Sequence, residues 1–131
     1  MSSNLDYLNR VYLRIDLDKI CNNIKEVINK VGKDTKVMAV VKADAYGHGA
    51  IEVSKALSEI GTYGFAVATV GEALALRRAG ITKPILILDF VFPNQFETII
   101  RNDIMLTVFR YEIAKELNEA AEQMGTTAHI H

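Results

Sequence analysis

Five short apolar segments, of which the first four are each followed by a helical pattern, constrain the fold of this chain more than any other feature. They begin near Val37, Gly64, Ile85, Ile104 and Thr127, so they recur at about the length of one strand plus one helix. Strands joined by such crossovers pair in parallel, because each crossover returns the chain to the same end of the sheet. The pattern therefore predicts an α/β fold with five parallel strands.

The boundaries follow from turn and capping residues. We expect strands over residues 37–42, 64–68, 85–88, 104–109 and 127–131. Helices are expected over 49–60, from Thr69 to just before Gly80, from Pro93 to Arg101 or Asn102, and over 111–124. Thr69 and Glu72 have the spacing of a capping box, which opens the second of these helices.

Two further elements are expected before this series. Val11, Leu13, Ile15 and Leu17 alternate with polar residues, which predicts a half-buried strand. An amphipathic helix is expected to follow, capped by Asp16 or Asp18 and ending at Gly32, and its apolar side includes Cys21. We interpret Cys21 as a buried small hydrophobe rather than a reactive nucleophile.

Two architectures accommodate such a chain. One is a complete doubly wound sheet of the flavodoxin type. The other is the first part of a (β/α)8 barrel, which typically needs about 250 residues. The 131 residues end inside the expected fifth strand, with no helix after it. That ending favours an incomplete TIM-type barrel of about five strands, preceded by the N-terminal strand.

Composition excludes several classes of function. The net charge of −1 and the scattered lysines and arginines give no field for nucleic acid or anionic lipid. No apolar run approaches the roughly 18 residues that a membrane span needs, and the N-terminus has no signal-peptide pattern. A single cysteine excludes an intramolecular disulfide framework and favours the reducing cytoplasm.

The stretch Val40–Gly49 carries the chemistry. Lys42 ends an apolar strand, where a lysine in apolar surroundings has a lowered pKa and its neutral amine is a nucleophile for aldehydes. Gly47 and Gly49 bracket His48 and predict a tight turn whose backbone N–H groups can approach a phosphate. Pyridoxal phosphate (PLP) needs both an amine and a phosphate-binding turn. The alternative is that Lys42 is an ordinary lysine at a strand end, with its amine in water.

This stretch reads V-V-K-A-D-A-Y-G-H-G and resembles the PLP-lysine signature of alanine racemases at all ten positions. The resemblance implies a PLP-dependent isomerase that racemises L-alanine and D-alanine, which supplies D-alanine for peptidoglycan. It implies that Lys42 is the Schiff-base lysine and one catalytic base. It also implies that the Tyr46 hydroxyl binds the cofactor phosphate and that Leu88 packs against the cofactor, although a plain core leucine is the alternative for Leu88. Asp44 and His48 are expected only to stabilise the turn.

The resemblance has consequences beyond the residues present. It implies that 1–16 packs with a distant β domain and that 17–131 is the first part of the barrel. The second base would be a tyrosine from the partner subunit of a homodimer, so the isolated chain is expected to be inactive. Three alternatives stay open: a racemase of another small amino acid such as serine, a non-catalytic PLP-binding barrel, and an inert piece.

Two other clusters receive structural interpretations. His129 and His131 have the i, i+2 spacing of metal ligands, but no third ligand is evident. We therefore expect them to fill barrel positions and predict no metal site. Arg77 and Arg78 are expected to be solvated at a helix end, where the helix dipole favours cations.

Overall fold

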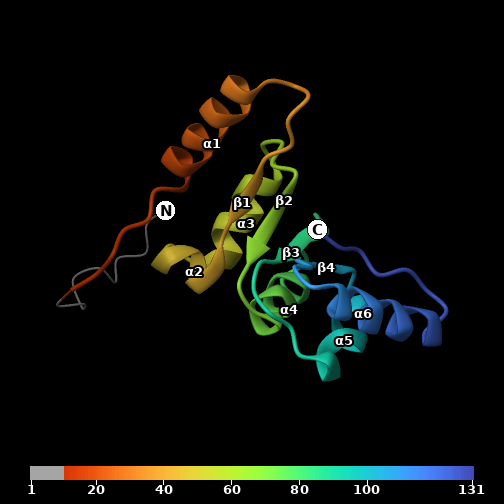
Figure 1. Ribbon diagram of the computed structural model, residues 1–131. Helices are drawn as coiled ribbons and strands as arrows, with labels where there is room; N and C mark the ends of the chain where they lie inside the picture. Colours follow the sequence, from red (N-terminus) through yellow and green to blue (C-terminus); the bar gives the residue numbers. More distant parts are fainter. Residues whose placement is uncertain (1–10) are drawn as a thin grey trace.

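The computed structural model describes residues 11–131, which contain a four-stranded parallel sheet. The strands are β1 (Met38–Val40), β2 (Gly64–Val67), β3 (Ile85–Ile87) and β4 (Ile104–Leu106). Their order in space is their order in sequence, β1-β2-β3-β4 (Figure 1). This simple order is that of successive strands around a barrel, whereas a doubly wound sheet reverses direction at a switch point. The α/β fold and the parallel pairing are confirmed.

The helices precede, separate and follow the strands as predicted, except that α2 occupies residues expected to form a strand end and a loop. Their bounds are α1 (Leu17–Val31), α2 (Lys42–Gly47), α3 (Ala50–Ser58), α4 (Val70–Arg78), the 3₁₀ turn η2 (Pro93–Gln95), α5 (Phe96–Arg101) and α6 (Tyr111–Gln123). The Asp16 side chain accepts a hydrogen bond from the Lys19 N–H at 3.1 Å and begins α1. Thr69 and Glu72 form the predicted capping box of α4.

The pairing register aligns the strands in rows that cross the sheet. One row consists of Val40, Ala66, Leu86 and Met105. The next row toward the carboxyl ends consists of Val41, Val67, Ile87 and Leu106. Successive rows point to opposite faces of a sheet. All four residues of the second row belong to the core that packs against the helices, whereas the first row faces away from it. Val40, on that other face, is 43% exposed.

Close backbone approach explains one small residue of the sheet. A Cβ atom at Gly64 would lie 2.5 Å from the Pro84 carbonyl oxygen, closer than real contacts allow. Glycine is therefore needed at the start of β2, where the Phe65 N–H donates to that same carbonyl at 2.9 Å.

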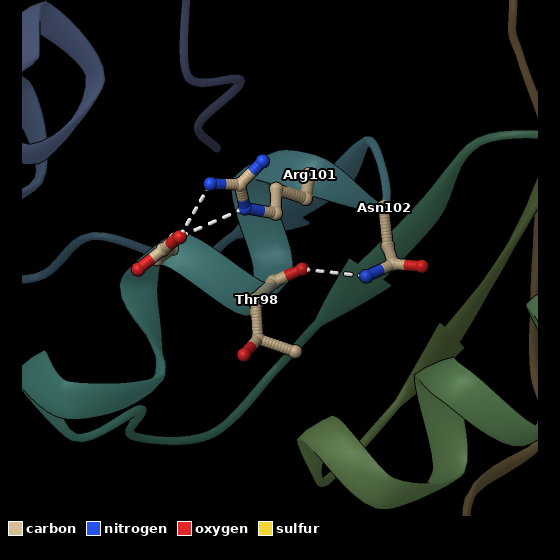
Figure 2. Close-up of polar contacts among 4 residues, drawn as sticks. Thr98, Arg101 and Asn102 are labelled. Atoms are coloured by element: carbon tan, nitrogen blue, oxygen red, sulfur yellow. Dashed lines mark hydrogen bonds and ion pairs between the residues drawn. The ribbon is translucent and has the colours of Figure 1, made fainter. Parts of the chain in front are cut away.

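Figure 2 shows the end of α5. The Asn102 side-chain amide donates to the Thr98 carbonyl at 2.8 Å and adds a second hydrogen bond to this acceptor, which also receives the Asn102 backbone N–H at 3.3 Å. Arg101 contacts the Glu97 carboxylate at 2.6 Å, one turn earlier on the helix. Both partners of this pair are well exposed, so it contributes only about 0.3–0.5 kcal/mol.

The predicted N-terminal strand is wrong for this structure. Residues 11–16 form no strand, and Val11 and Leu13 are 86% and 76% exposed. Alternation alone does not make a strand, because the backbone also needs a partner strand to accept its hydrogen bonds. Part of the predicted 1–16 segment lies outside the described residues.

The predicted fifth strand is present only as one parallel bridge between Leu106 and Ile130. The His131 N–H donates to the Leu106 carbonyl at 2.9 Å, and the Leu106 N–H donates to the His129 carbonyl at 3.2 Å. This segment therefore pairs beside β4 on the side and in the direction expected, over fewer residues than predicted.

Two predictions about single residues need correction. Arg77 is not solvated: its guanidinium reaches the loops before β3 and β4 and donates to the carbonyls of Ile81, Lys83, Asn102 and Asp103 at 2.7–2.9 Å. Its burial lowers its pKa, which the neighbouring Asp103 partly opposes. Cys21 is half-buried rather than buried, because α1 packs against α3 at one edge of the fold and none of its residues is fully buried.

His129 and His131 lie in the sheet rows of Met105 and Thr107, on the face that points away from the helices, and both side chains are exposed. That they fill barrel positions stays a prediction. His129 also lies 3.7 Å from the Asp103 carboxylate. Over residues 11–131, no three His, Cys, Asp or Glu side chains group as metal ligands do. Across the same residues, no helix has the length and apolar character needed to cross a membrane.

Candidate active site

The residues singled out by the sequence lie at the carboxyl edge of the sheet. The row beyond Val41 consists of Lys42, Ala68, Leu88 and Thr107. The Leu88 N–H donates to the Val67 carbonyl and the Val41 N–H to the Ala66 carbonyl, both at 2.8 Å, so the sheet pairing extends to this edge. Active sites of parallel barrels lie at this edge. Lys42 and Leu88 are two strands apart, which separates their backbones by roughly 10 Å.

The chain turns left-handed directly after Lys42. Four consecutive residues, Ala43 to Tyr46, have φ between 50° and 55° and ψ between 38° and 49°. This conformation costs about 1–2 kcal/mol for each non-glycine residue, so roughly 4–8 kcal/mol for the turn. Strain of this kind persists only where the surroundings enforce it, and it concentrates at functional sites. The structure thus marks residues 42–47 as a specialised segment.

Contacts within the segment enforce the turn. The Ala45 side chain is buried at 6% exposure, and its N–H donates to the Val41 carbonyl at 3.0 Å. The Asp44 carboxylate accepts the Ala50 N–H at 2.7 Å and so begins α3. The His48 Nδ1 lies 3.0 Å from the Ala45 carbonyl oxygen. The predicted local roles of Asp44 and His48 in this turn are confirmed.

Glu72 provides the contact from outside the segment. Its Oε1 accepts the Ala43 N–H at 2.7 Å, while Oε2 accepts the N–H groups of Ala68 and Thr69 at 2.8 and 3.2 Å. Partial burial raises the pKa of the Glu72 carboxyl, but these three hydrogen bonds and the Lys42 charge outweigh it and lower the pKa below the usual 4.5. The carboxylate is therefore ionised at neutral pH and joins the ends of β1 and β2.

The glycine turn does not provide phosphate-binding amides in the way the sequence predicted. The His48 N–H donates to the Ala45 carbonyl, and the Gly49 N–H donates to the Asp44 carbonyl at 2.9 Å. The Ala50 N–H is taken by the Asp44 side chain. These three amides are used to close the left-handed turn, so they are not available to a ligand.

The side chains at this edge still suit a cofactor that carries an aldehyde and a phosphate. Lys42 is partly exposed and can present an amine, and Tyr46 is 61% exposed about one turn later, with its phenol open to solvent. Leu88 is 40% exposed and offers an apolar contact. In the same row, the Thr107 hydroxyl oxygen is buried without a hydrogen-bond partner in the described structure. Amine, hydroxyl and apolar groups thus line one edge.

Two residues of this site were not predicted from the sequence. Glu72 was predicted only as a capping residue, because its bond to Ala43 joins positions 29 apart and depends on the β1–β2 register. Thr107 lay inside an expected strand with no signal to separate it from its neighbours. Only the alignment of strand ends across the sheet could have pointed to either residue.

Comparison with known proteins identifies the family to which this chain is similar. Residues 15–131 match the family model described as alanine racemase, N-terminal domain. The alanine racemase of Clostridium perfringens strain SM101 is 49% identical over 121 residues, which are 92% of this chain and 31% of that protein. The alanine racemase of Methanococcus maripaludis is 47% identical over 121 residues, which are 92% of this chain and 32% of that protein. The chain therefore spans about a third of the length of these relatives.

Solved structures agree with the sequence comparison. The alanine racemase of Clostridium difficile 630 superimposes with a TM-score of 0.80 at 43% identity, covering 88% of this chain and 29% of that one. That of Bacillus anthracis with bound L-Ala-P gives a TM-score of 0.81 at 38% identity, covering 92% and 32%. The β1–β4 sheet and its helices thus correspond to the N-terminal part of the racemase barrel, and the chain belongs to the alanine racemase family.

Proposed function

We propose that this chain is the lysine-bearing part of a PLP-dependent alanine racemase. The observation that carries the proposal is the position of Lys42, at the carboxyl edge of the sheet and at the start of a strained turn that Glu72 and the core enforce. The names of the relatives favour alanine over serine as the substrate. The 117 matched residues also favour a catalytic protein over a non-catalytic carrier or an inert piece.

Each site residue has a defined task in this proposal. PLP, when bound, supplies an electron sink that makes the Cα proton of an amino acid removable near neutral pH. The Lys42 Nζ would hold the cofactor through its aldehyde carbon and, once released, accept or return the proton on one face of Cα. The Tyr46 hydroxyl would donate to the phosphate, and the Leu88 side chain would exclude water beside the ring.

The remaining parts of the proposal concern the whole protein. Racemisation needs a second base on the opposite face of Cα, and we propose that it comes from the partner subunit of a homodimer. Residues 17–131 would form the first part of the barrel, while residues 1–16 would pack against a separate β domain. The single cysteine is consistent with a role in the cytoplasm, where D-alanine for peptidoglycan would be made.

Reductive labelling tests the assignment of Lys42. The chain is mixed with limiting PLP, reduced with borohydride and mapped by peptide mass spectrometry. Lys55 serves as the internal control, because its side chain is 52% exposed on α3, where its amine lies 3.9 Å from the exposed Glu52 carboxylate. We expect Lys42 to be labelled at least about tenfold more than Lys55, a preference of about 1.4 kcal/mol. Equal labelling of the two lysines would refute the assignment.

A further inference from the structure

Two flanking hydrogen bonds fix the backbone on both sides of Lys42. On one side, the Val41 N–H donates to the Ala66 carbonyl of β2 at 2.8 Å. On the other side, the Ala43 N–H donates to Glu72 Oε1 at 2.7 Å. The first bond is ordinary sheet pairing. The second is a short bond to a charged acceptor on α4, of the kind that is stronger than neutral bonds.

The capping role of Glu72 does not account for this second bond. A capping box needs the N3 side chain to accept only the N-cap N–H, which here is that of Thr69. Oε2 already fulfils that role and accepts the Ala68 N–H as well. Oε1 is thus left for Ala43, 29 positions away, at the first residue of the left-handed turn.

We propose that Glu72 is a positioning residue for Lys42: its carboxylate fixes the strained backbone after the lysine and so determines where the amine meets the cofactor. This inference rests on the proposed function, since it concerns the same amine. It assigns to Glu72 a role in the site that its capping-box motif does not contain. The Lys42 charge also contributes to the lowered pKa of the Glu72 carboxyl.

Two variants separate the positioning role from the capping role. Gln is accepted in a capping box, so Glu72→Gln keeps its carbonyl oxygen at the cap. Its NH2 group, which can only donate, then faces the Ala43 N–H, and that bond is lost. Thr69→Ala does the reverse, because it removes the hydroxyl that accepts the Glu72 N–H at 3.2 Å and leaves the carboxylate in place.

The first measurement is amide hydrogen exchange at Ala43 by NMR, in the chain without cofactor. We expect Glu72→Gln to accelerate exchange at Ala43 by about tenfold or more, because the lost bond had a charged acceptor. Thr69→Ala should lower the unfolding midpoint and leave Ala43 exchange within about twofold of the parent chain, a change below 0.5 kcal/mol. Equal effects of the two variants on Ala43 would overturn the proposal.

The second measurement is the labelling ratio of Lys42 to Lys55. Glu72→Gln should bring the ratio close to one, whereas Thr69→Ala should retain the parent preference. If the parent chain itself shows no preference for Lys42, the proposed function fails, and the exchange experiment still decides whether Glu72 fixes the turn. A parent preference that persists in Glu72→Gln would refute the positioning role alone.

A titration of the parent chain covers the case in which Glu72→Gln does not fold. Because Ala43 and Ala68 donate to the same carboxylate, their amide proton shifts should move together as that group is protonated in acid. A common midpoint supports the shared contact. An Ala43 shift that stays constant while the Ala68 shift titrates would overturn it.

Discussion

Replacing Ala43 by glycine tests the left-handed turn most directly. Ala43 is exposed and has φ 50° and ψ 49°, a conformation in which the Cβ of an L-residue is too close to the backbone. Removing that Cβ relieves about 1–2 kcal/mol of strain. The glycine keeps the N–H that donates to Glu72. A substitution that destabilises an ordinary helix should therefore stabilise this chain.

Glycine also has an entropic cost, and a matched variant measures it. Ala75 is likewise exposed but lies inside the right-handed helix α4, where Ala→Gly costs about 1 kcal/mol. Ala43→Gly has a similar entropic cost and recovers the strain, so its net effect on the free energy of unfolding should lie between about 0 and +1 kcal/mol. The difference between the two variants isolates the strain, at about 1–2 kcal/mol.

Urea denaturation followed by far-UV circular dichroism provides the measurement. We compare the free energies of unfolding of the parent chain, Ala43→Gly and Ala75→Gly. The comparison assumes that the three proteins have the same dependence of this free energy on urea concentration, so that only stability differs. We expect Ala43→Gly to unfold at the same or a higher urea concentration than the parent, and Ala75→Gly at a lower one. If both variants lose about 1 kcal/mol, residue 43 is not left-handed in solution and the argument from strain fails.

Three further predictions follow from single contacts. Arg77→Met should lower the free energy of unfolding by about 3 kcal/mol, because four carbonyls lose their hydrogen-bond donor. The control Arg78→Met should change it by less than about 0.5 kcal/mol. Similar losses of stability for the two variants in thermal unfolding would contradict this prediction. Thr62→Val should stabilise the chain by about 1 kcal/mol, since the fully buried hydroxyl has no partner in the described structure, and a loss of stability in urea would argue that it has one. Because its folded-state pKa is lowered, Glu72 contributes stability that is present above pH 4.5 and is lost as the pH falls through the lowered value. Acid titration of stability should therefore be shallower in Glu72→Gln, and identical curves would exclude this contribution.

Local patterns determined most of the fold. Helix starts at Asp16 and Thr69 were predictable because a capping side chain acts on an amide three residues away. The strands were predictable because runs such as Ile85–Ile87 are apolar on both faces. The site lysine was predictable from its place after such a run. In each case, the interactions that determine the structure lie within a few residues of sequence.

The predictions that proved wrong concern features that depend on contacts between distant segments of the chain. The alternation of residues 11–17 predicted a strand, but pairing depends on a neighbour that the pattern does not contain. The glycines around His48 indicated a turn without revealing that its amides bond to Ala45 and Asp44. Arg77 resembled a solvated residue because its carbonyl partners belong to loops up to 26 positions away. The sequence alone does not distinguish an arginine at a helix end that is solvated from one that donates hydrogen bonds to distant loops.

The alignment of Lys42 with Leu88 across the sheet restricts how this protein can change in length. Deleting one residue within Met38–Val40 would shift the register of β1 by one position. The Lys42 side chain would then point to the face of the sheet that packs against the helices, and not to the face that it shares with Leu88. Insertions in the loop between Gly32 and Val37 would leave that register intact. Functional variants of this sequence should therefore tolerate changes of length before β1 but keep the number of residues from Met38 to Lys42 unchanged.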